Sequence, residues 1–415
     1  MIEGINKLGN PESCKICLYD TNHPLGLTIN SDGVCSGCQF HEEKDNLDWV
    51  KKLDTLKTLT ARYKSKSKKN YDCIIPISGA NDSYFIVHVV KNILGMNPLL
   101  VTYNKYFNTP LGIRNLANLR IKFDCDILIQ NVNPLSVKKI VRNTLPNFGS
   151  IYWHCIAGQT VFPVQTAIHK QIPLIIWGAH QGNEQVGMFK HEHEVEMTRR
   201  YRKDHDLMGF EADDLISTFN NLDESDIWQY RYPDDSDLKK VGVRGIYLGN
   251  YIRWDPKAQH ELMINKYDYE TSKFSRTFDA YDHTDCYNFM NLHDKLKLYK
   301  HGYSKVLDHA TREIRHKRIS RQQGLSIVKK YQLQPSHYEN LFSEWLGIDE
   351  QALQFVLNQH RSSLFWQEDI PGNWIFKKES NLKHRSFEIE KTFNKNSDLN
   401  RKSNIGYITV GKGYP

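Results

Sequence analysis

Hydrophobic and polar positions along the chain change from a helical spacing to short apolar runs. Between residues 46 and 63, apolar side chains recur at intervals of three, at Leu47, Val50, Leu53, Leu56 and Leu59, which predicts an amphipathic helix. From Tyr71 onward, apolar runs at residues 73–77, 98–103, 126–130 and 173–177 alternate with stretches long enough to form helices. This alternation predicts an α/β fold with a parallel sheet, whose strands are joined by right-handed crossovers.

The loops after these strands are the first place to expect chemistry. In parallel sheets, ligands bind beyond the carboxyl ends of the strands. We therefore expect a ligand site among residues 78–83, 104–108 and 178–184. Beyond about residue 285 the spacing is again helical, and Ser320 with Gln323 predicts a capping box that opens a helix reaching Tyr331.

Composition and charge narrow the class of protein. No window approaches the ~18 consecutive apolar residues of a membrane span, and the N-terminus lacks the pattern of a signal peptide, so we expect a cytoplasmic protein without membrane insertion. The net charge of +7 is modest for 415 residues. It suits anionic small molecules such as nucleotides, whereas on charge alone nucleic-acid binding is the less favoured interpretation.

Four of the eight cysteines form two C-x-x-C pairs near the N-terminus. Cys14 and Cys17 are separated from Cys35 and Cys38 by seventeen residues, which is typical of a structural Zn²⁺ site with four thiolate ligands. An iron–sulfur cluster is the alternative, because the same ligands can hold one. The remaining cysteines stand alone and are predicted to be small buried hydrophobic residues; they are Cys73, Cys125, Cys155 and Cys286.

The stretch Ser78-Gly79-Ala80-Asn81-Asp82-Ser83 joins a predicted strand to a predicted helix. Backbone N–H groups at such a junction can bind an anion, and an aspartate there makes sense if Mg²⁺ accompanies a phosphate. The G-x-x-x-x-G-K-[ST] pattern of the P-loop NTPases is absent. A plain tight turn is the alternative interpretation.

This stretch resembles the S-G-G-x-D-S signature of the PP-loop, or N-type ATP pyrophosphatase, superfamily, whose members cleave ATP to AMP and pyrophosphate while adenylating an oxygen of their substrate. Further stretches resemble the N-acetyl sugar amidotransferases of bacterial surface-polysaccharide biosynthesis, which includes the O-antigen of lipopolysaccharide and capsule. They are IPLIIWG at 172–178, VGVRGIYLGNYIRWD at 241–255, HGYSK at 301–305 and DHATREIR at 308–315. The resemblance covers most of the chain to about Tyr331.

The resemblance implies an adenine nucleotide alpha hydrolase-like domain at residues 71–284, with a charged lid insertion at about 189–233. Residues 1–45 then form the zinc-binding module, residues 46–70 form a helix and a basic linker, and residues 285–415 form a mainly helical C-terminal region. The sequence His191-Glu192-His193-Glu194 lacks the H-E-x-x-H spacing of a metal site, so we interpret it as part of a charged lid helix.

Site residues follow from the resemblance. Ser78, Gly79, Asn81 and Ser83 would hold the pyrophosphate, with Asp82 on Mg²⁺. Ala80 stands where the signature has its second glycine, so either the loop tolerates alanine or ATP binding is weakened.

Later loops complete the predicted site. Tyr103 and Asn104 would lie near the adenosine. Gly178 would allow close approach, and Glu184 would hold Mg²⁺ or accept a proton from attacking ammonium; a solvated loop carboxylate is the alternative for Glu184.

Three arginines are the predicted contacts for the anionic part of a nucleotide-linked sugar, because a guanidinium group pairs well with phosphate or carboxylate. They are Arg253, Arg312 and Arg315. Arg312 and Arg315 are three residues apart, so an exposed helix face is the alternative interpretation.

The implied reaction converts an acetamido group to an acetamidino group, with ATP, Mg²⁺ and ammonia. The chain offers neither an N-terminal nucleophilic cysteine, since residue 2 is Ile2, nor a G-x-C-x-G motif, so ammonia must come free or from another protein. The resemblance implies a separate glutaminase subunit with a cyclase-like companion. Two alternatives are a PP-loop tRNA thiolase, which the lack of a further C-x-x-C pair disfavours, and a non-catalytic zinc-ribbon adaptor.

Overall fold

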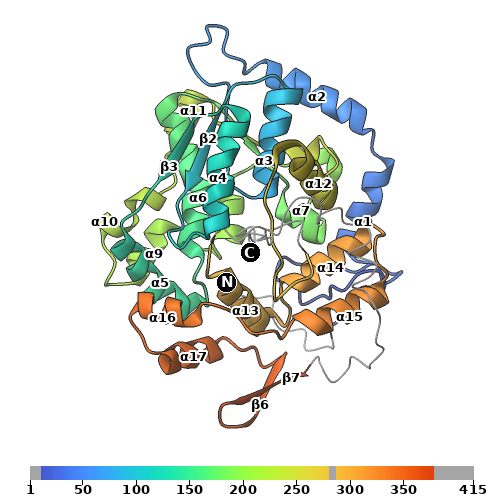
Figure 1. The fold of residues 1–415 in the computed structure, drawn as a ribbon, viewed down its shortest axis with the longest axis vertical. Coiled ribbons are helices and arrows are strands. Elements are labelled where there is room, and N and C mark those ends of the chain that lie inside the picture. The colour runs from blue at the N-terminus through green and yellow to red at the C-terminus, as the bar shows by residue number, and fades with distance from the viewer. Residues whose placement is uncertain (1–10, 280–286, 378–415) are drawn as a thin grey trace.

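The computed structural model describes residues 11–279 and 287–377, and its centre is a five-stranded parallel sheet (Figure 1). The strands lie in the order β3-β2-β1-β4-β5, and their bounds are Cys73–Pro76 (β1), Pro98–Tyr103 (β2), Ile127–Gln130 (β3), Leu174–Trp177 (β4) and Arg244–Tyr247 (β5). The four predicted strands and their parallel pairing are confirmed. β5 is not among the predicted strands, because Arg244 and Gly245 leave it only a very short apolar run.

Strand order reverses next to β1. The chain runs outward from β1 to β2 and β3, and then returns to the other side of β1 for β4 and β5. Ile74 of β1 pairs with Ile175 of β4, so the carboxyl ends of these two strands lie side by side. Such a reversal leaves a crevice at the carboxyl edge of the sheet, where ligands bind.

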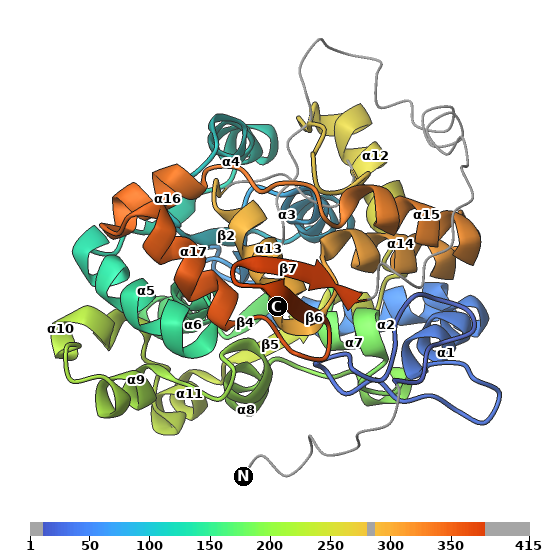
Figure 2. The same cartoon turned by 90° about the horizontal axis from the view of Figure 1, so that it is seen from below.

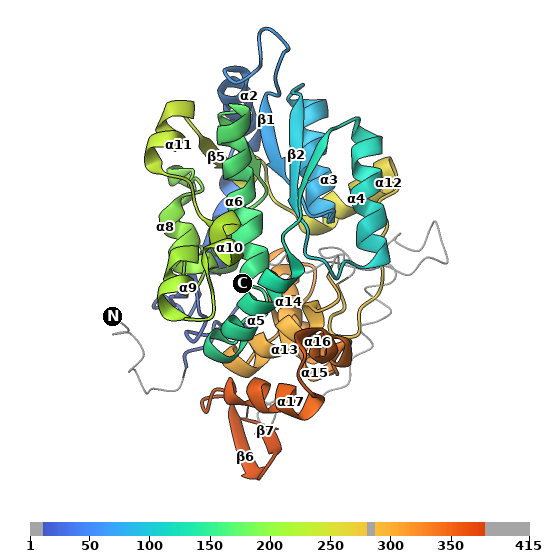
Figure 3. The same cartoon turned by 90° about the vertical axis from the view of Figure 1, so that its left-hand side faces the viewer.

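Helices cover both faces of the sheet, as Figure 3 shows. Cys73 and Ile75 of β1 share a core with α3, α4 and α12, whereas Ile74 shares a core with α6 and α11 on the opposite face. Burial on both faces explains why the strands read as continuous apolar runs. These helices have the bounds Asn81–His88 (α3), Pro110–Phe123 (α4), Trp153–Lys170 (α6), Asp235–Val241 (α11) and Pro256–Tyr267 (α12).

The N-terminal module leads into the predicted amphipathic helix. Helix α1 spans Ser36–Glu43, and α2 spans Trp49–Ala61, which confirms the helix predicted between residues 46 and 63. The Asp48 carboxylate accepts a hydrogen bond from the Lys51 backbone N–H and so caps α2.

Residues 189–233 form short helical segments that pack beside α6. The Nε of the buried Arg202 donates to Thr160 Oγ1 of α6 at 2.8 Å, and the Trp153 indole donates to the Phe210 carbonyl at 2.9 Å. The segments are 3₁₀ turns at His191–His193 and Trp228–Tyr230, a π turn at Arg202–Asp206, and helices α8 (Arg199–Tyr201), α9 (Ala212–Thr218) and α10 (Glu224–Ile227).

The described part of the C-terminal region, residues 287–377, is mostly helical, and its last elements form a hairpin (Figure 2). The predicted capping box is confirmed, because Ser320 Oγ accepts from the Gln323 N–H at 3.2 Å and Gln323 Oε1 accepts from the Ser320 N–H at 2.8 Å. The antiparallel hairpin of β6 (Trp366–Ile370) and β7 (Asn373–Phe376) is an addition to the mainly helical region predicted. The helices are α13 (Met290–His301), α14 (Lys305–Arg315), α15 (Arg321–Tyr331), α16 (Glu339–Leu346) and α17 (Glu350–Gln359).

Two further helices complete the described chain: α5 (Pro134–Phe148), and α7 (Gln181–Val186), which follows β4. No helix among the described residues has the length and apolar character needed to cross a membrane.

Candidate functional site

The loop after β1 has the conformation of a strand-to-helix anion turn. Gly79 has a φ of +82°, a value that favours glycine, whereas Ala80 has an extended backbone with φ −76° and ψ 169° and precedes α3. Ala80 is therefore unstrained, and its methyl group is buried in the protein core. Ser83 Oγ accepts a hydrogen bond from the Ser78 N–H at 3.0 Å, which closes the loop on itself.

We expect Gly79→Ala to damage this loop and Ala80→Gly to leave it nearly intact. A Cβ on Gly79 would lie 3.3 Å from the Gly112 carbonyl oxygen, and its positive φ would cost a further roughly 1–2 kcal/mol. Ala80→Gly changes only chain entropy and core contact, at a cost of about 1 kcal/mol. Urea unfolding and nucleotide-binding titrations of both variants measure this. A Gly79→Ala variant as stable as Ala80→Gly would contradict it.

A pocket of about 900 Å³, open to solvent, lies at the carboxyl edge of the sheet. We call it the loop pocket; its lining includes Ser78, Asp82, Ser83, Tyr103, Lys105, Gln159, Trp177, Gly178, Gln181, Asp206 and Tyr247. The structure thus brings five predicted site residues together, namely Ser78, Asp82, Ser83, Tyr103 and Gly178.

The other predicted nucleotide contacts lie outside this lining. Gly79 and Ala80 belong to the loop without lining the pocket, and Asn104 at the end of β2 donates through its side-chain amide to Asn131 Oδ1 at 2.6 Å. Asn81 begins α3, and its side chain lies outside what the structure describes.

Tyr103 is held as a wall of the loop pocket. Its hydroxyl lies 3.0 Å from His154 Nδ1 and 2.8 Å from the Tyr230 hydroxyl. A Cβ on Gly158 of α6 would lie 2.2 Å from Tyr103 Cδ2, so glycine is needed for this close packing. Burial lowers the pKa of His154 to about 3, so its imidazole is neutral near pH 7.

Lys105 and Asp206 also line the loop pocket, and neither was singled out in the sequence. Lys105 lies within a predicted ligand loop, so its position was a usable signal, and its Nζ is 5.6 Å from the centroid of the Tyr152 ring. Asp206 ends the π turn in the charged segment, where nothing distinguishes it from neighbouring acids. Burial raises the pKa of Asp206 to about 7, although Arg202 opposes this shift.

Replacing Asp206 with asparagine is expected to flatten the pH dependence of stability. Because the folded protein holds the Asp206 proton up to about pH 7 and the unfolded chain releases it near pH 4, wild-type stability falls as pH rises between these values. Between pH 5 and pH 8 the wild type should lose roughly 2–3 kcal/mol relative to Asp206→Asn. Urea unfolding of both proteins at the two pH values, without Mg²⁺, measures it. Identical pH slopes would rule the explanation out.

A second pocket of about 910 Å³ adjoins the loop pocket at Gln181, which lines both. Its walls come from the N-terminal module, α7, the segment after β5, α13 and α14. We call it the second pocket; its lining is Tyr19, His41, Gln181, Glu184, Gln185, Trp254, Pro256, Met290, His293, Asp294, Lys297, Lys305, Asp308, His309, Arg312 and Arg315.

Glu184 faces the second pocket, whereas Gly178 lines the loop pocket, so the two do not close one site as expected. Glu184 Oε1 accepts a hydrogen bond from Lys44 Nζ at 2.6 Å, and Oε2 lies 3.5 Å from His41 Nε2. The Lys44 side chain is 2% exposed. Glu184 on α7 therefore forms an ion pair with the N-terminal module, and it is not the solvated loop carboxylate of the alternative interpretation.

The three predicted arginines have different surroundings. Arg312 Nη2 donates to Asp279 Oδ2 at 2.7 Å, and Arg315 Nη1 donates to the Glu184 and Gln185 carbonyl oxygens at 2.8 Å. Both line the second pocket and are not an exposed helix face. Arg253 pairs with Asp45 and is not part of either pocket lining.

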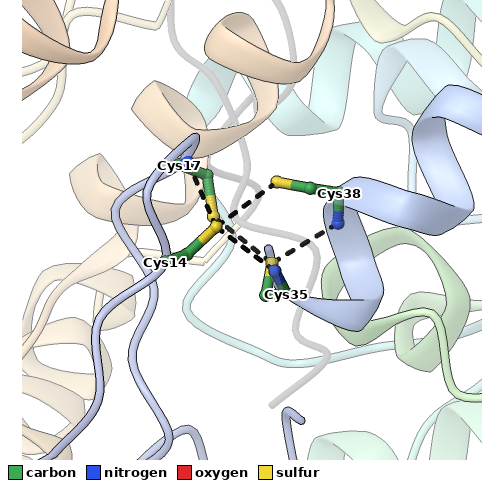
Figure 4. Close-up of side chains that lie close together, drawn as sticks. All are labelled: Cys14, Cys17, Cys35 and Cys38. Atoms are coloured by element: carbon green, nitrogen blue, oxygen red, sulfur yellow. Dashed lines mark hydrogen bonds between the residues drawn. The ribbon is translucent and has the colours of Figure 1, made fainter. Parts of the chain in front are cut away.

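The four N-terminal cysteines converge as predicted (Figure 4). All are buried, and their sulfur atoms lie within 4.8 Å of one another. Cys14 Sγ is 3.9 Å from Cys38 Sγ, and Cys17 Sγ is 3.6 Å from Cys35 Sγ. Thiolates 2.3 Å from one tetrahedral zinc ion would be roughly 3.8 Å apart, so the set fits zinc. An iron–sulfur cluster, which spreads its cysteines over several irons, fits this close spacing less well.

The cysteine cluster is tied to the wall of the second pocket. Arg315 Nη2 lies 3.5 Å from Cys35 Sγ, and Ser36 Oγ donates to the Val186 carbonyl oxygen at 2.6 Å. A Cβ on Gly37 would lie 2.3 Å from Arg315 Nη2, so Gly37 permits this approach. The metal module therefore packs directly on α7 and α14.

The remaining cysteines and the His191–Glu194 stretch form no metal site among the described residues. Cys73 and Cys155 are buried as predicted, Cys125 is half-buried, and Cys286 lies outside the described residues. His191 lies in a 3₁₀ turn rather than a lid helix and stacks on Phe40 with ring centroids 3.8 Å apart.

Comparison with protein families adds the decisive observation. Residues 271–380 match the family model described as "LPS biosynthesis protein WbpG-like, C-terminal domain". This region is similar to that domain. A comparison with curated proteins gave no match. The predicted resemblance to a bacterial polysaccharide-biosynthesis family is thereby confirmed, and the domain supports a role in lipopolysaccharide biosynthesis.

The WbpG-like domain contributes most of the second pocket. Its helices α13 and α14 supply the lining from Met290 to Arg315, while α7 and the zinc module supply the facing wall. The polysaccharide-related part of the chain thus meets the α/β part at Gln181, which both pockets share.

Proposed function

We propose that this protein is an ATP-dependent, AMP-forming amidotransferase that converts an acetamido group of a nucleotide-linked N-acetyl sugar into an acetamidino group, for O-antigen or capsule synthesis. The observation that carries the proposal is the pair of adjoining pockets. One is lined by Ser78, Asp82 and Ser83 of the loop, and the other is built largely by the region that matches the WbpG-like model. Two reactants bound on either side of Gln181 would meet at their boundary.

The chemistry needs an activated oxygen, because an amide carbon resists attack by ammonia. The acetamido oxygen attacks the α-phosphorus of ATP and releases pyrophosphate, which leaves an O-adenylated imidate. Ammonia then adds to the imidate carbon, and the C–O bond breaks so that AMP departs with the former amide oxygen. The products are the amidine, AMP and pyrophosphate, and the protein contributes positioning and charge neutralisation.

The loop residues suit this role. The Ser83 hydroxyl accepts from the Ser78 N–H, so its own proton is available to a phosphate oxygen. Gly79 permits the turn that brings Ser78 and the first turn of α3 to the loop pocket, where they would meet the pyrophosphate. Asp82 would hold Mg²⁺, which when bound neutralises phosphate charge.

Ammonia would come from a separate glutaminase subunit with a cyclase-like companion, which we propose as partners. The described lone cysteines give no sign of a built-in glutaminase: Cys73 and Cys155 are fully buried. Gln181 at the boundary of the pockets, with Asp206 on the loop-pocket side, offers polar groups near the point where ammonia must arrive.

The test is an assay with Mg-ATP, an ammonium salt and a panel of UDP- and CMP-linked diacetamido sugars. AMP release and sugar mass are followed together. A product in which one oxygen is exchanged for NH, formed with one equivalent of AMP, is expected. AMP formation that depends on tRNA instead of sugar would favour a thiolase, and failure to bind ATP would favour a non-catalytic adaptor.

A further inference from the structure

The four cationic side chains that line the second pocket differ in whether they have partners within the protein. They are Lys297, Lys305, Arg312 and Arg315. Lys297 pairs with Asp308, and Arg312 pairs with Asp279. Arg315 Nη1 donates to two backbone carbonyl oxygens, and Nη2 donates to the sulfur atoms of Cys17 and Cys35. Arg312 and Arg315, which were predicted to bind an anionic substrate, therefore form contacts within the protein. Arg315 joins α14 to α7 and to the cysteine module.

Lys305 is the exception among these four cations. Its side chain is 8% exposed, and its Nζ is buried without a hydrogen-bond partner among the described residues. The Nζ atom lies 4.2 Å from the centroid of the Phe274 ring. A cation–π contact recovers only part of the hydration that a buried ammonium group loses.

The nearby carboxylate of Asp294 attracts the Lys305 charge but makes no hydrogen bond to Nζ. Asp294 Oδ1 accepts from the Lys305 backbone N–H at 2.6 Å, and Oδ2 accepts from Arg276 Nε at 2.9 Å. Asp294 therefore caps α14 and pairs with a buried arginine, which leaves the Lys305 ammonium group facing the pocket.

Two further buried polar atoms of the same lining also have no partner in the described residues: His293 Nδ1 and Arg315 Nε. Burial lowers the pKa of His293 to about 3, so the ring is neutral at pH 7 and can donate one hydrogen bond and accept another. Three unsatisfied polar groups in one pocket are unusual, since buried polar groups are nearly always paired.

We propose that Lys305 is the anion contact of the second pocket, binding a phosphate or carboxylate oxygen of the substrate with His293 beside it, and that Arg312 and Arg315 are positioning residues. This deepens the proposed function, on which it rests for naming the ligand a nucleotide-linked sugar. An anionic oxygen would supply the partner that Nζ lacks and form a charge-assisted hydrogen bond.

Lys305→Met tests the proposal, because methionine keeps most of the stem and removes the charge. The probes are UDP, which has phosphate but no carboxylate, and a diacetamido uronic acid without nucleotide, which has only the carboxylate. Calorimetry should show at least 10-fold weaker binding of one probe, and that probe identifies the group. Lys305→Arg should recover most of the affinity, and ATP affinity should stay within threefold of the wild type.

Lys295→Met is the matched control, since Lys295 lies on α13 and pairs with Glu339 outside the second pocket. Its probe affinities should equal those of the wild type. Without ligand, Lys305→Met should unfold at about the same temperature as wild type, because Nζ has no hydrogen-bond partner to lose among the described residues. A marked fall in melting temperature would assign Lys305 a structural role and overturn the proposal.

Equal affinity of wild type and Lys305→Met for both probes, including no binding by either protein, would also overturn it. The outcome is separable from that of the proposed function. Probe binding that depends on Lys305 without any amidination would reject the amidotransferase and keep the anion contact. Amidination with unchanged probe binding and KM in Lys305→Met would do the reverse.

Discussion

Asp82→Asn is expected to lower AMP-forming activity by about 10²–10³-fold while leaving the fold intact. Asp82 lies in the first turn of α3 and lines the loop pocket, where a carboxylate would repel a bare phosphate. It is therefore understandable as a ligand of a metal ion that accompanies the phosphates. Asparagine keeps the shape and can still accept the Ser83 N–H that now bonds to Asp82 Oδ1 at 3.0 Å.

The measurement is AMP release over a range of Mg²⁺ concentrations. The variant should need more Mg²⁺ to reach half its maximal rate, since a charged ligand has been lost. Asp54→Asn is the matched control, because Asp54 is an exposed acid on α2, and its only ion pair among the described residues is with Lys57. If Asp82→Asn kept wild-type activity and the same Mg²⁺ dependence, Asp82 would not be a metal ligand.

Loss of the metal is the second large effect expected. Cys38→Ser should reduce the zinc content below one ion per chain and destabilise the N-terminal module, since structural zinc supplies folding energy directly. This module provides Tyr19 and His41 to the second pocket and pairs Lys44 with Glu184. We therefore expect sugar-dependent activity to fall at least 10-fold and the free energy of unfolding to fall by roughly 3–5 kcal/mol.

The loop pocket should be less affected, because the module contacts the second pocket. ATP affinity, measured by calorimetry, is expected to stay within about threefold of wild type, while zinc is measured by mass spectrometry. Cys125→Ser is the matched control: Cys125 is half-buried and is not one of the four clustered cysteines, and its thiol donates to the Phe123 carbonyl oxygen. A Cys38→Ser protein with full zinc content and full activity would contradict a four-thiolate site.

Local sequence patterns were enough for several features. The four central strands show as apolar runs because a parallel sheet buries both faces, and Ser320 with Gln323 signals a helix start because the capping bonds span only three residues. The cysteine pairs are similarly local, since each C-x-x-C turn presents two ligands by itself. β5 and the β6–β7 hairpin were missed because their apolar runs are short and interrupted by polar residues.

The division of the site into two pockets could not be read from the chain. Gly178 and Glu184 are six residues apart, yet they line different pockets, because Gly178 precedes α7 and Glu184 lies on it; Gln181 at the start of α7 lines both pockets. Arg312 and Arg315 match a binding pattern, but their N–H groups already donate hydrogen bonds within the protein. The acceptors are Asp279 for Arg312, and the carbonyl oxygens of α7 and the cysteine sulfur atoms for Arg315. Lys305 and Asp206 have no sequence signal, since what distinguishes them is burial.

The sequence by itself therefore determined the parallel α/β core, the position of the loop pocket, the cluster of four cysteines that fits zinc, and the resemblance to a polysaccharide-biosynthesis family. Periodicity, capping and short motifs act over a few residues, so they survive in a linear reading. Tertiary structure alone decided that Lys305 Nζ is buried without a hydrogen-bond partner among the described residues, and that Glu184 faces the second pocket. Charge pairing and desolvation depend on neighbours that lie a hundred or more residues away, as with Lys44 and Glu184.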